Sequence, residues 1–353
     1  MGGHPDASSL VRAHADSRAR VGAGAPIDRV TRERAEDDGL DPFATRARGA
    51  GQRARAEEPD PWRTCFERDR DRILHSAPFR RLAGKTQVFV FPEDHMRTRL
   101  THALEVAQVA RAVARGLGLN ETLTEAIALG HDCGHGPGGH ASEEALDPFC
   151  EGGFDHAPWG ADVVLAPLNL CAETLDGIRN HSWSRPAPAT PEGEVVSWAD
   201  RIAYVCHDFE DAVAAGIVEP DDLPVVVRER VGAGRGRQLG GFIAALVAAT
   251  RETGVVGLDA ATAEALAAFR ALNYERIYLR GASREQAGRV VEMLRALVAF
   301  YRENPELLPE DLAGRPVTRA VTYVAGMTDR FAVRRAIEHL DWPRERLPSG
   351  VDR

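Results

Sequence analysis

One amphipathic segment constrains the fold of this chain more than any other feature. From Arg97 to Leu117 the sequence reads RTRLTHALEVAQVARAVARGL, and its apolar residues recur with the 3.6-residue period of an α-helix. One face holds Leu100, Ala103, Leu104, Ala107 and Ala110, and an adjacent face holds Val106, Val109 and Val113. We expect a helix that is apolar over so much of its circumference to lie in the core, and we expect Gly118 to end it.

The other periodic segments also predict helices, so the expected fold class is mainly α with little β. The stretch 66–82 begins as a helix, and Pro78 breaks or restarts it. Further helices are expected at 121–130, 142–146, 161–165, 170–178, 195–215, 242–250, 260–279 and 284–301. The alternation in 87–91 (QVFVF) is the best candidate for a strand.

Composition divides the chain into three parts. Residues 1–58 are rich in Arg, Ala, Gly and Asp, so we expect an N-terminal extension that is partly disordered. A single domain is expected over 59–333, followed by a C-terminal tail at 334–353. The N-terminus lacks the apolar stretch of a secretory signal, and no apolar run has the length of a membrane span, so a cytoplasmic protein is expected.

Charge and cysteine content exclude several classes of protein. The 44 Lys and Arg residues against 53 Asp and Glu residues leave a net charge of −9. This balance disfavours a broad electrostatic grip on nucleic acid or on acidic membranes. The five cysteines contain no CxxC pair, so neither a disulfide framework nor a zinc knuckle is expected.

Three of the twelve histidines lie within ten residues, in the segment 131–140 (HDCGHGPGGH). His131 and Asp132 place an imidazole beside a carboxylate at a helix end, and the glycines let backbone and substrate approach closely. Such a segment is either a loop whose histidines bind backbone groups or a site for a metal or a phosphate. Three histidines with an adjoining aspartate favour the second interpretation.

Residues outside this segment could complete a metal site. His102 lies on the core helix, where an imidazole without a partner would be costly. Arg99 lies three residues earlier on the same side, suited to an anion held by the metal. Asp200 belongs to a polar stripe over 200–211 that, taken alone, is typical of a solvated helix face. Two histidines and two aspartates suit Mn, Fe, Co, Ni or Mg better than a thiolate-type zinc site.

The pattern formed by His102, His131-Asp132 and Asp200 resembles the HD-domain metal-dependent phosphohydrolases. Longer strings resemble the deoxyguanosinetriphosphate triphosphohydrolase (dGTPase) family among them. They follow that family's order and spacing over roughly 31–333: DPFATRA (41–47), FERDRDRILHSAPFRRLAGKTQVF (66–89), RTRLTHALEVAQVAR (97–111), HDCGHGPGGHASEEAL (131–146), ADRIAYVCHDFEDA (199–212) and GMTDRFA (326–332). The resemblance implies a mostly helical single domain that assembles as a homo-oligomer.

In that family, a deoxynucleoside triphosphate (dNTP) such as dGTP is hydrolysed to the deoxynucleoside and tripolyphosphate. The resemblance implies one divalent metal ion per site, with manganese among the candidates. Its implied ligands are His102, His131, Asp132 and Asp200. The ion would polarise the α-phosphoryl oxygens and lower the pKa of a bound water.

The resemblance also implies catalytic and substrate-binding residues. His140 and Glu143 match the family's His-x-x-Glu pair, in which the carboxylate would orient the imidazole for proton transfer. His135 matches a histidine beside the phosphates. The implied substrate contacts are Arg99, Arg201 and Lys85 (the only lysine) for the phosphates, Gln87, Tyr204 and Asp208 for the deoxyribose, and His156, which lacks the Asn and Gln that usually follow it.

Two competing functions are an HD phosphohydrolase for another nucleotide, such as a monophosphate or an alarmone, and a non-catalytic regulator that binds nucleotide or single-stranded DNA. The complete set of ligand positions and the net charge argue against the regulator. An allosteric nucleotide or single-stranded DNA stays open as a further partner, and a membrane is not expected. Asn180–Ser182 could contact substrate, but a helix cap is the favoured interpretation, and the resemblance assigns no role to 326–330 (GMTDR).

Overall fold

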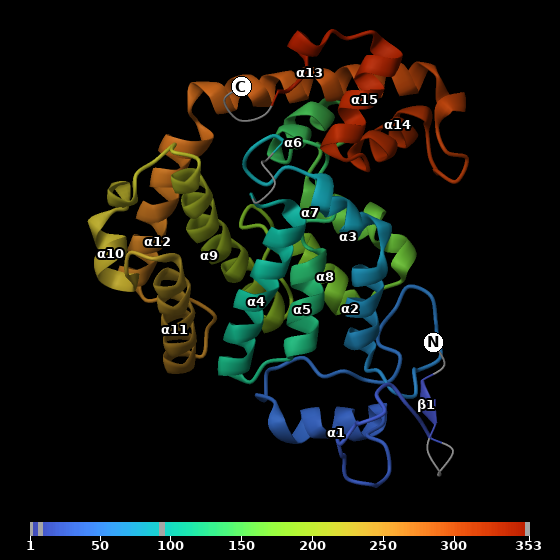
Figure 1. The fold of residues 1–353 in the computed structure, drawn as a ribbon, viewed down its shortest axis with the longest axis vertical. Helices are drawn as coiled ribbons and strands as arrows, with labels where there is room; N and C mark the ends of the chain where they lie inside the picture. The colour runs from blue at the N-terminus through green and yellow to red at the C-terminus, as the bar shows by residue number, and fades with distance from the viewer. Residues whose placement is uncertain (1–2, 6–9, 92–95, 350–353) are drawn as a thin grey trace.

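A computed structural model describes residues 3–5, 10–91 and 96–349 (Figure 1). The fold is mainly helical, as the sequence predicts. Its α-helices are α1 (Arg29–Gly39), α2 (Cys65–His75), α3 (Ala77–Arg81), α4 (Arg99–Leu117), α5 (Glu121–Gly130), α6 (His140–Leu146), α7 (His156–Trp159), α8 (Ala172–Asn180), α9 (Pro191–Ala214), α10 (Val225–Val231), α11 (Arg235–Thr253), α12 (Ala260–Asn273), α13 (Gly281–Glu303), α14 (Pro316–Ala325) and α15 (Asp329–Leu340). In the described ranges the strands are β1 (His4–Pro5) and β2 (Val11–Arg12), which pair antiparallel.

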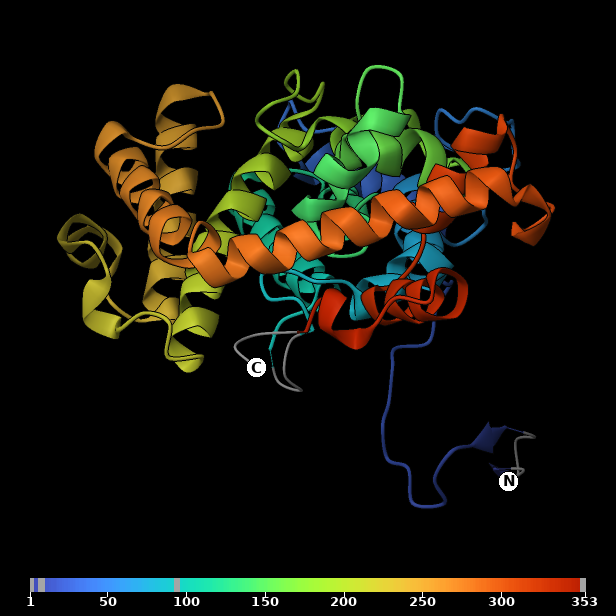
Figure 2. The same ribbon diagram turned by 90° about the horizontal axis from the view of Figure 1, so that it is seen from above.

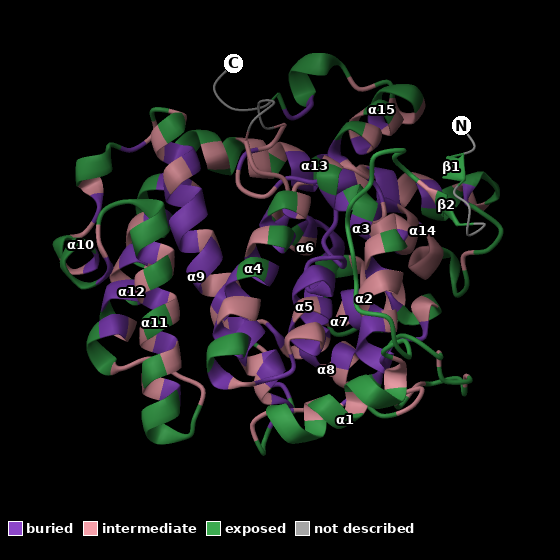
Figure 3. Cartoon of the chain, turned by 60° about the horizontal axis from the view of Figure 1, so that its bottom comes forward, coloured by how far each residue is buried: buried purple, intermediate pink, exposed green. Residues whose placement is uncertain are grey.

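Helix α4 lies at the centre of the larger of two apolar cores. It packs against α5, α9 and α11, and α5 packs in turn against α2 and α8. The α4 side chains from Ala103 to Leu117 that face these neighbours are buried, whereas Leu104, expected in the core, is 48% exposed. Gly118 ends the helix at φ 67°, a left-handed conformation that glycine adopts without strain. Figure 3 shows buried residues concentrated on these central helices.

Helix α13 organises the second core. It crosses the molecule as a long helix and packs against α6, α14 and α15 (Figure 2). The apolar side chains between these helices include Leu294, Leu297 and Val321, all of them buried. Since α6 directly follows the 131–140 segment, this second core supports the candidate site from the C-terminal side. In the described part of the chain, no helix is long and apolar enough to cross a membrane.

The strand expected at 87–91 is wrong. This segment is irregular, and its neighbour Thr86 forms only an isolated bridge with Thr98. A strand needs a partner, and none of the described residues offers this segment a ladder. Phe89 is buried among helices instead, so the alternating apolar residues serve packing.

The segment before α2 contacts the central helices through one buried carboxylate. Glu192, in the first turn of α9, accepts hydrogen bonds from the backbone N–H of Thr45 (2.9 Å), from the Thr45 hydroxyl (2.7 Å) and from the backbone N–H of Asn120 (3.0 Å). These three bonds join the chain before α2, the start of α5 and α9. The division of the chain at residues 58 and 333 stays a prediction.

Replacing Glu192 should therefore destabilise the fold. Glu192→Ala leaves three donors without their acceptor, and we expect a loss of about 3 kcal/mol in the free energy of unfolding. Urea denaturation followed by circular dichroism measures it. Glu252→Ala, at an exposed position of α11, is the control and should change stability little. Equal midpoints for the two variants would contradict the structural role of Glu192.

Candidate metal centre and cavity

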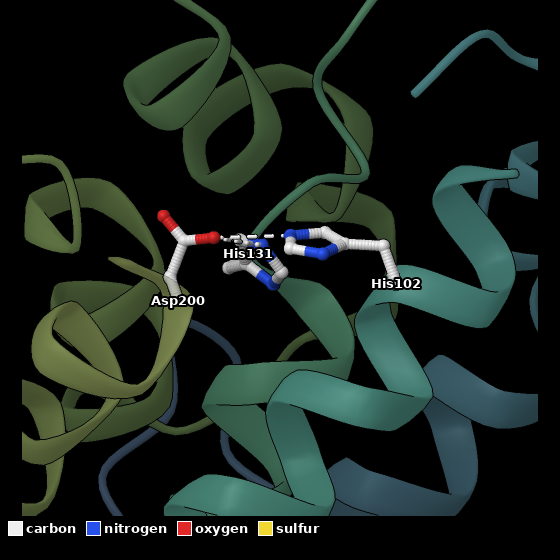
Figure 4. Close-up of side chains that lie close together, drawn as sticks. All are labelled: His102, His131 and Asp200. Carbon is white, nitrogen blue, oxygen red and sulfur yellow. Dashed lines mark hydrogen bonds and ion pairs between the residues drawn. The ribbon is translucent and has the colours of Figure 1, made fainter. Parts of the chain in front are cut away.

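Three helices bring the candidate ligands together. His102 comes from α4, His131 directly follows α5, and Asp200 comes from the middle of α9 (Figure 4). Asp132 is the next residue after His131. Nε2 of His102 lies 3.0 Å from Oδ1 of Asp200. Nε2 of His131 lies 3.7 Å from the same oxygen and 3.5 Å from Oδ1 of Asp132. Side chains 98 positions apart in the sequence thus face one another.

The geometry of these atoms fits a divalent cation. Nδ1 of His131 is 2.6 Å from the carbonyl oxygen of Ala128, so it donates a proton there and directs Nε2 toward the carboxylates. That Nε2 atom is buried and has no hydrogen-bond partner. A cation with ligand bonds of about 2.1 Å separates its ligand atoms by about 3.0–3.5 Å, close to the distances found here.

Electrostatics favour a cation at the same point. Burial lowers the pKa of His131, but the carboxylates of Asp132 and Asp200 outweigh it and raise this pKa to about 9. Burial would raise the pKa of Asp200, but the imidazoles of His102 and His131 hold it well below its usual range. The negative charges of Asp132 and Asp200 are therefore partly neutralised by the protonated imidazole of His131. A bound divalent cation would replace that proton.

Arg99 adds a second cationic group. It is 1% exposed, and its Nη1 donates to Oδ2 of Asp132 at 2.7 Å. Its Nε and Nη2 atoms are buried without a partner, which leaves donors for an anion. Gly139 makes this arrangement possible, because a Cβ there would lie 2.8 Å from Nη2 of Arg99 and its φ is +63°.

Glu143 has a different partner from the one expected. Its Oε1 accepts a hydrogen bond from Nδ1 of His156 at 2.6 Å and another from the His156 backbone N–H at 3.2 Å. Burial would raise the pKa of Glu143, but His156 outweighs it and lowers this pKa to about 2, so the carboxylate is ionised. The expectation that Glu143 orients His140 is therefore corrected: Glu143 orients His156, and the His140 ring is exposed to the cavity.

His181 is a site residue that the sequence analysis missed. It is buried, its Nε2 lies 3.2 Å from Nε2 of His156, and its Nδ1 lies 2.8 Å from the carbonyl oxygen of Ile178. His135 stacks on the other side of His156, with ring centroids 3.7 Å apart. His131 and His181 each directly follow a helix, and each donates to a carbonyl three residues earlier. A histidine at the end of a predicted helix is the sequence signal that could have found His181.

These groups face a cavity of about 1070 Å³. Eleven of the expected site residues line it: Gln87, Arg99, His102, Asp132, His135, His140, His156, Asp200, Arg201, Tyr204 and Asp208. His131 and Glu143 lie behind this wall, in contact with residues that line it.

Lys85 does not face the cavity. Its Nζ donates to the carbonyl oxygens of His135 and Ala325, the latter at 3.1 Å, and burial lowers its pKa to about 8. The expectation that Lys85 contacts phosphate is corrected on this geometry, because its donors are directed at backbone oxygens. The ammonium instead joins the 131–140 segment to the end of α14.

The segment 326–330 also binds the 131–140 segment, through Asp329. Oδ2 of Asp329 accepts from the backbone N–H of Thr86 (2.9 Å) and from its hydroxyl (2.5 Å), while Oδ1 accepts from the backbone N–H of Gly138 (2.8 Å). Asp329 is buried, at the start of α15. Together with Lys85, it fixes the loop that carries His135 and His140 to the C-terminal helices.

A further group of polar atoms lines the cavity away from the candidate metal ligands. Oδ2 of Asp208 accepts from the hydroxyl of Tyr278, and its Oδ1 is buried without a partner. Burial raises the pKa of Asp208 to about 7. Oε1 of Gln87 is also buried with no partner among the described residues, and the Tyr204 hydroxyl accepts from Nε of Arg270 at 3.1 Å. This part of the cavity therefore offers free oxygen acceptors and tyrosine rings beside the guanidinium of Arg270.

The pKa of Asp208 predicts a pH effect on stability. Because the folded-state pKa is raised from 3.8 to about 7, the folded protein holds a proton that the unfolded chain loses, and stability falls as pH rises between these values. Asp208→Asn removes this pH-dependent loss of stability. As the pH rises from 5 to 7, the melting temperature of the variant should therefore increase relative to that of the unaltered protein. Asp221→Asn, whose side chain is 97% exposed, is the control. A melting-temperature difference that stays constant with pH would contradict the buried neutral carboxyl.

Comparisons with known proteins agree with this arrangement. Residues 99–205, which contain all four candidate ligands, match the HD domain, and residues 256–337 match the phosphohydrolase-associated domain. A solved structure of a hypothetical protein from Aquifex aeolicus has a TM-score of 0.52 and 18% identity, and the match covers 78% of this chain and 69% of that one. It shows a shared fold.

Curated relatives match over most of the chain. A deoxyguanosinetriphosphate triphosphohydrolase-like protein of Caldanaerobacter subterraneus is 43% identical over 311 residues, 83% of this chain and 90% of the relative. A protein of the same description from Clostridium perfringens strain 13 is 42% identical over 79% of this chain and 87% of its own length. A third, from Deinococcus radiodurans, is 38% identical over 83% of this chain and 94% of its own length. The chain therefore belongs to the deoxyguanosinetriphosphate triphosphohydrolase-like family of HD-domain phosphohydrolases.

Proposed function

We propose that this phosphohydrolase hydrolyses deoxynucleoside triphosphates, dGTP among them, to the deoxynucleoside and tripolyphosphate, with one divalent metal ion per site. The observation that supports this most is that potential ligand atoms of His102, His131 and Asp200 meet in one group, with Asp132 between His131 and Arg99, beside one large cavity. A cation and a guanidinium side by side match a polyphosphate group.

Four residues would hold the cation: His102 and His131 through Nε2, and Asp132 and Asp200 through their carboxylates. A bound divalent ion would supply a polarised α-phosphoryl group and a water of lowered pKa. The mixed nitrogen and oxygen ligands suit Mn, Fe, Co, Ni or Mg. Arg99 would hold the phosphate oxygens beside the cation through its unpartnered Nη2.

Proton transfer would involve His156 and His140. A carbonyl oxygen only accepts, so Nδ1 of His181 donates to Ile178 and its Nε2 accepts from Nε2 of His156. Nδ1 of His156 lies 2.6 Å from Oε1 of the ionised Glu143, so this carboxylate fixes the orientation of the ring. We propose that Glu143 positions His156 and that His140, exposed to the cavity, exchanges protons with the reacting groups.

The remaining cavity residues would bind the rest of the nucleotide. Gln87 and Asp208 offer unpartnered oxygens, and Tyr204 and Tyr278 offer aromatic faces. Selection of deoxyribose over ribose would require these side chains to fill the space that a 2′-hydroxyl occupies. Assembly of several copies and a cytoplasmic location stay predictions.

The products of the reaction test this proposal. Purified protein is incubated with each dNTP and NTP in turn, with Mn, Mg, Co, Fe or Ni, and the products are separated by chromatography. We expect tripolyphosphate and the deoxynucleoside. Release of phosphate or pyrophosphate would favour an HD phosphohydrolase with another nucleotide substrate, and tight binding without turnover would favour a regulator.

Removing a candidate ligand should remove both metal and turnover. His131→Ala or Asp200→Ala is expected to lower metal content, measured by elemental analysis, to background and to abolish hydrolysis while circular dichroism stays helical. His75→Ala, at an exposed position of α2, is the matched control. Near-normal turnover in either ligand variant would contradict the metal assignment.

Neutralising Glu143 should slow the reaction and spare the metal. Glu143→Gln loses the carboxylate that orients His156, so we expect a decrease in kcat on the order of 10² with unchanged metal content. Glu144→Gln changes the adjacent, exposed carboxylate and should leave kcat unchanged. If both variants turned over equally fast, Glu143 would have only a structural role.

A further inference from the structure

An arginine and a tryptophan form a stacked pair at the cavity. Cζ of Arg201 lies 3.5 Å from the centroid of the Trp183 ring. Arg201 follows Asp200 on α9, whereas Trp183 lies in the connection between α8 and α9, and both residues line the cavity. The favoured expectation for this connection was a helix cap, and the sequence assigned no role to Trp183.

The guanidinium of Arg201 lacks a compensating charge. Within residues 3–5, 10–91 and 96–349, no carboxylate forms an ion pair with it, and its Nε is buried without a hydrogen-bond partner. Asp200 is its neighbour in sequence, but the carboxylate of Asp200 faces His102 and His131. An uncompensated cation at a cavity wall is suited to an anionic ligand.

The tryptophan is fixed to the helix that carries the arginine. Nε1 of Trp183 donates to the carbonyl oxygen of Ser197 at 3.1 Å, one turn of α9 before Arg201. The ring also packs edge-on against Trp198, with centroids 4.7 Å apart and an interplanar angle of 74°. Trp183 is nevertheless 48% exposed. A large aromatic side chain held this firmly at a cavity provides a flat surface on which a guanidinium can stack.

Stacking determines where the donors of Arg201 are directed. A guanidinium is planar, so when one face lies on a ring, its N–H groups are directed outward in the plane. Without that surface, the long side chain would sample many more rotamers. Stacking therefore reduces the conformational entropy that the Arg201 side chain loses when it binds an anion through two parallel hydrogen bonds.

We propose that Trp183 is a positioning residue that holds Arg201 in place to bind the polyphosphate group of the substrate. The proposal rests on the proposed function, since it names a residue that acts on the same substrate. It assigns Trp183 an effect that passes through Arg201, with no contact of its own to the reacting atoms.

A double-mutant cycle on the binding of inorganic tripolyphosphate tests this, with Mn²⁺ present throughout and calorimetry as the measurement. We expect Trp183→Ala to weaken binding about tenfold and Trp183→Phe, which keeps a ring, to weaken it about twofold or less. In the Arg201→Ala background, Trp183→Ala should have no further effect, because the two residues act as one unit. Trp62→Ala, at an exposed position before α2, is the control.

Kinetics give a second measurement. Trp183→Ala should raise KM for dGTP more than it lowers kcat, and Trp183→Phe should restore KM. Additive losses in the cycle, or a Phe variant as weak as the Ala variant, would overturn the positioning role. If the unaltered protein hydrolyses dNTPs while Trp183→Ala binds tripolyphosphate normally, this inference alone fails. If the unaltered protein neither binds tripolyphosphate nor hydrolyses any dNTP, the proposed function fails with it.

Discussion

Two carboxylates placed in the interior of a helical protein must be compensated by positive charge, and this requirement determines the arrangement of the central helices. Asp132 is almost completely buried, and Arg99 and the neighbouring imidazoles hold its pKa well below its usual range although burial acts the other way. Asp200 is compensated by His102 and His131. These residues come from α4, the end of α5 and α9, so the packing of the three helices brings the charges together. An arrangement of this kind is suited to a cation and to the anion that accompanies it.

The 131–140 segment is held by contacts from both apolar cores. On one side, His131 is fixed by the carbonyl of Ala128 at the end of α5. On the other side, Asp329 and Lys85 bind its backbone through Gly138 and His135. The match of residues 256–337 to a phosphohydrolase-associated domain thus has a physical meaning, because this region supplies hydrogen bonds that a free Gly-rich loop would lack.

Much of the fold and of the site could be predicted from the sequence. Helix 121–130 has the expected bounds, and the helix expected at 97–117 begins only two residues later, since strong 3.6-residue periodicity and clear end signals determine both. Local sequence patterns are less informative about which residues contact one another in the fold. The alternation at 87–91 predicts a strand only if another strand lies beside it, and spacing in sequence pairs Glu143 with His140 although the fold brings His156 closer. The buried position of Lys85 depends on a carbonyl of Ala325, 240 residues away, which no local pattern reveals.

The contact between Asp329 and Gly138 also has a consequence for synthesis on the ribosome. The two residues are 191 positions apart, so at typical elongation rates about 10–40 s pass between their incorporation. During that interval, the helices around α4 can already pack, but the Gly-rich loop lacks the carboxylate that binds its backbone. A nascent chain therefore acquires its core before its finished active-site geometry, and any truncated product that ends before residue 329 would be folded in part and yet incomplete where chemistry takes place.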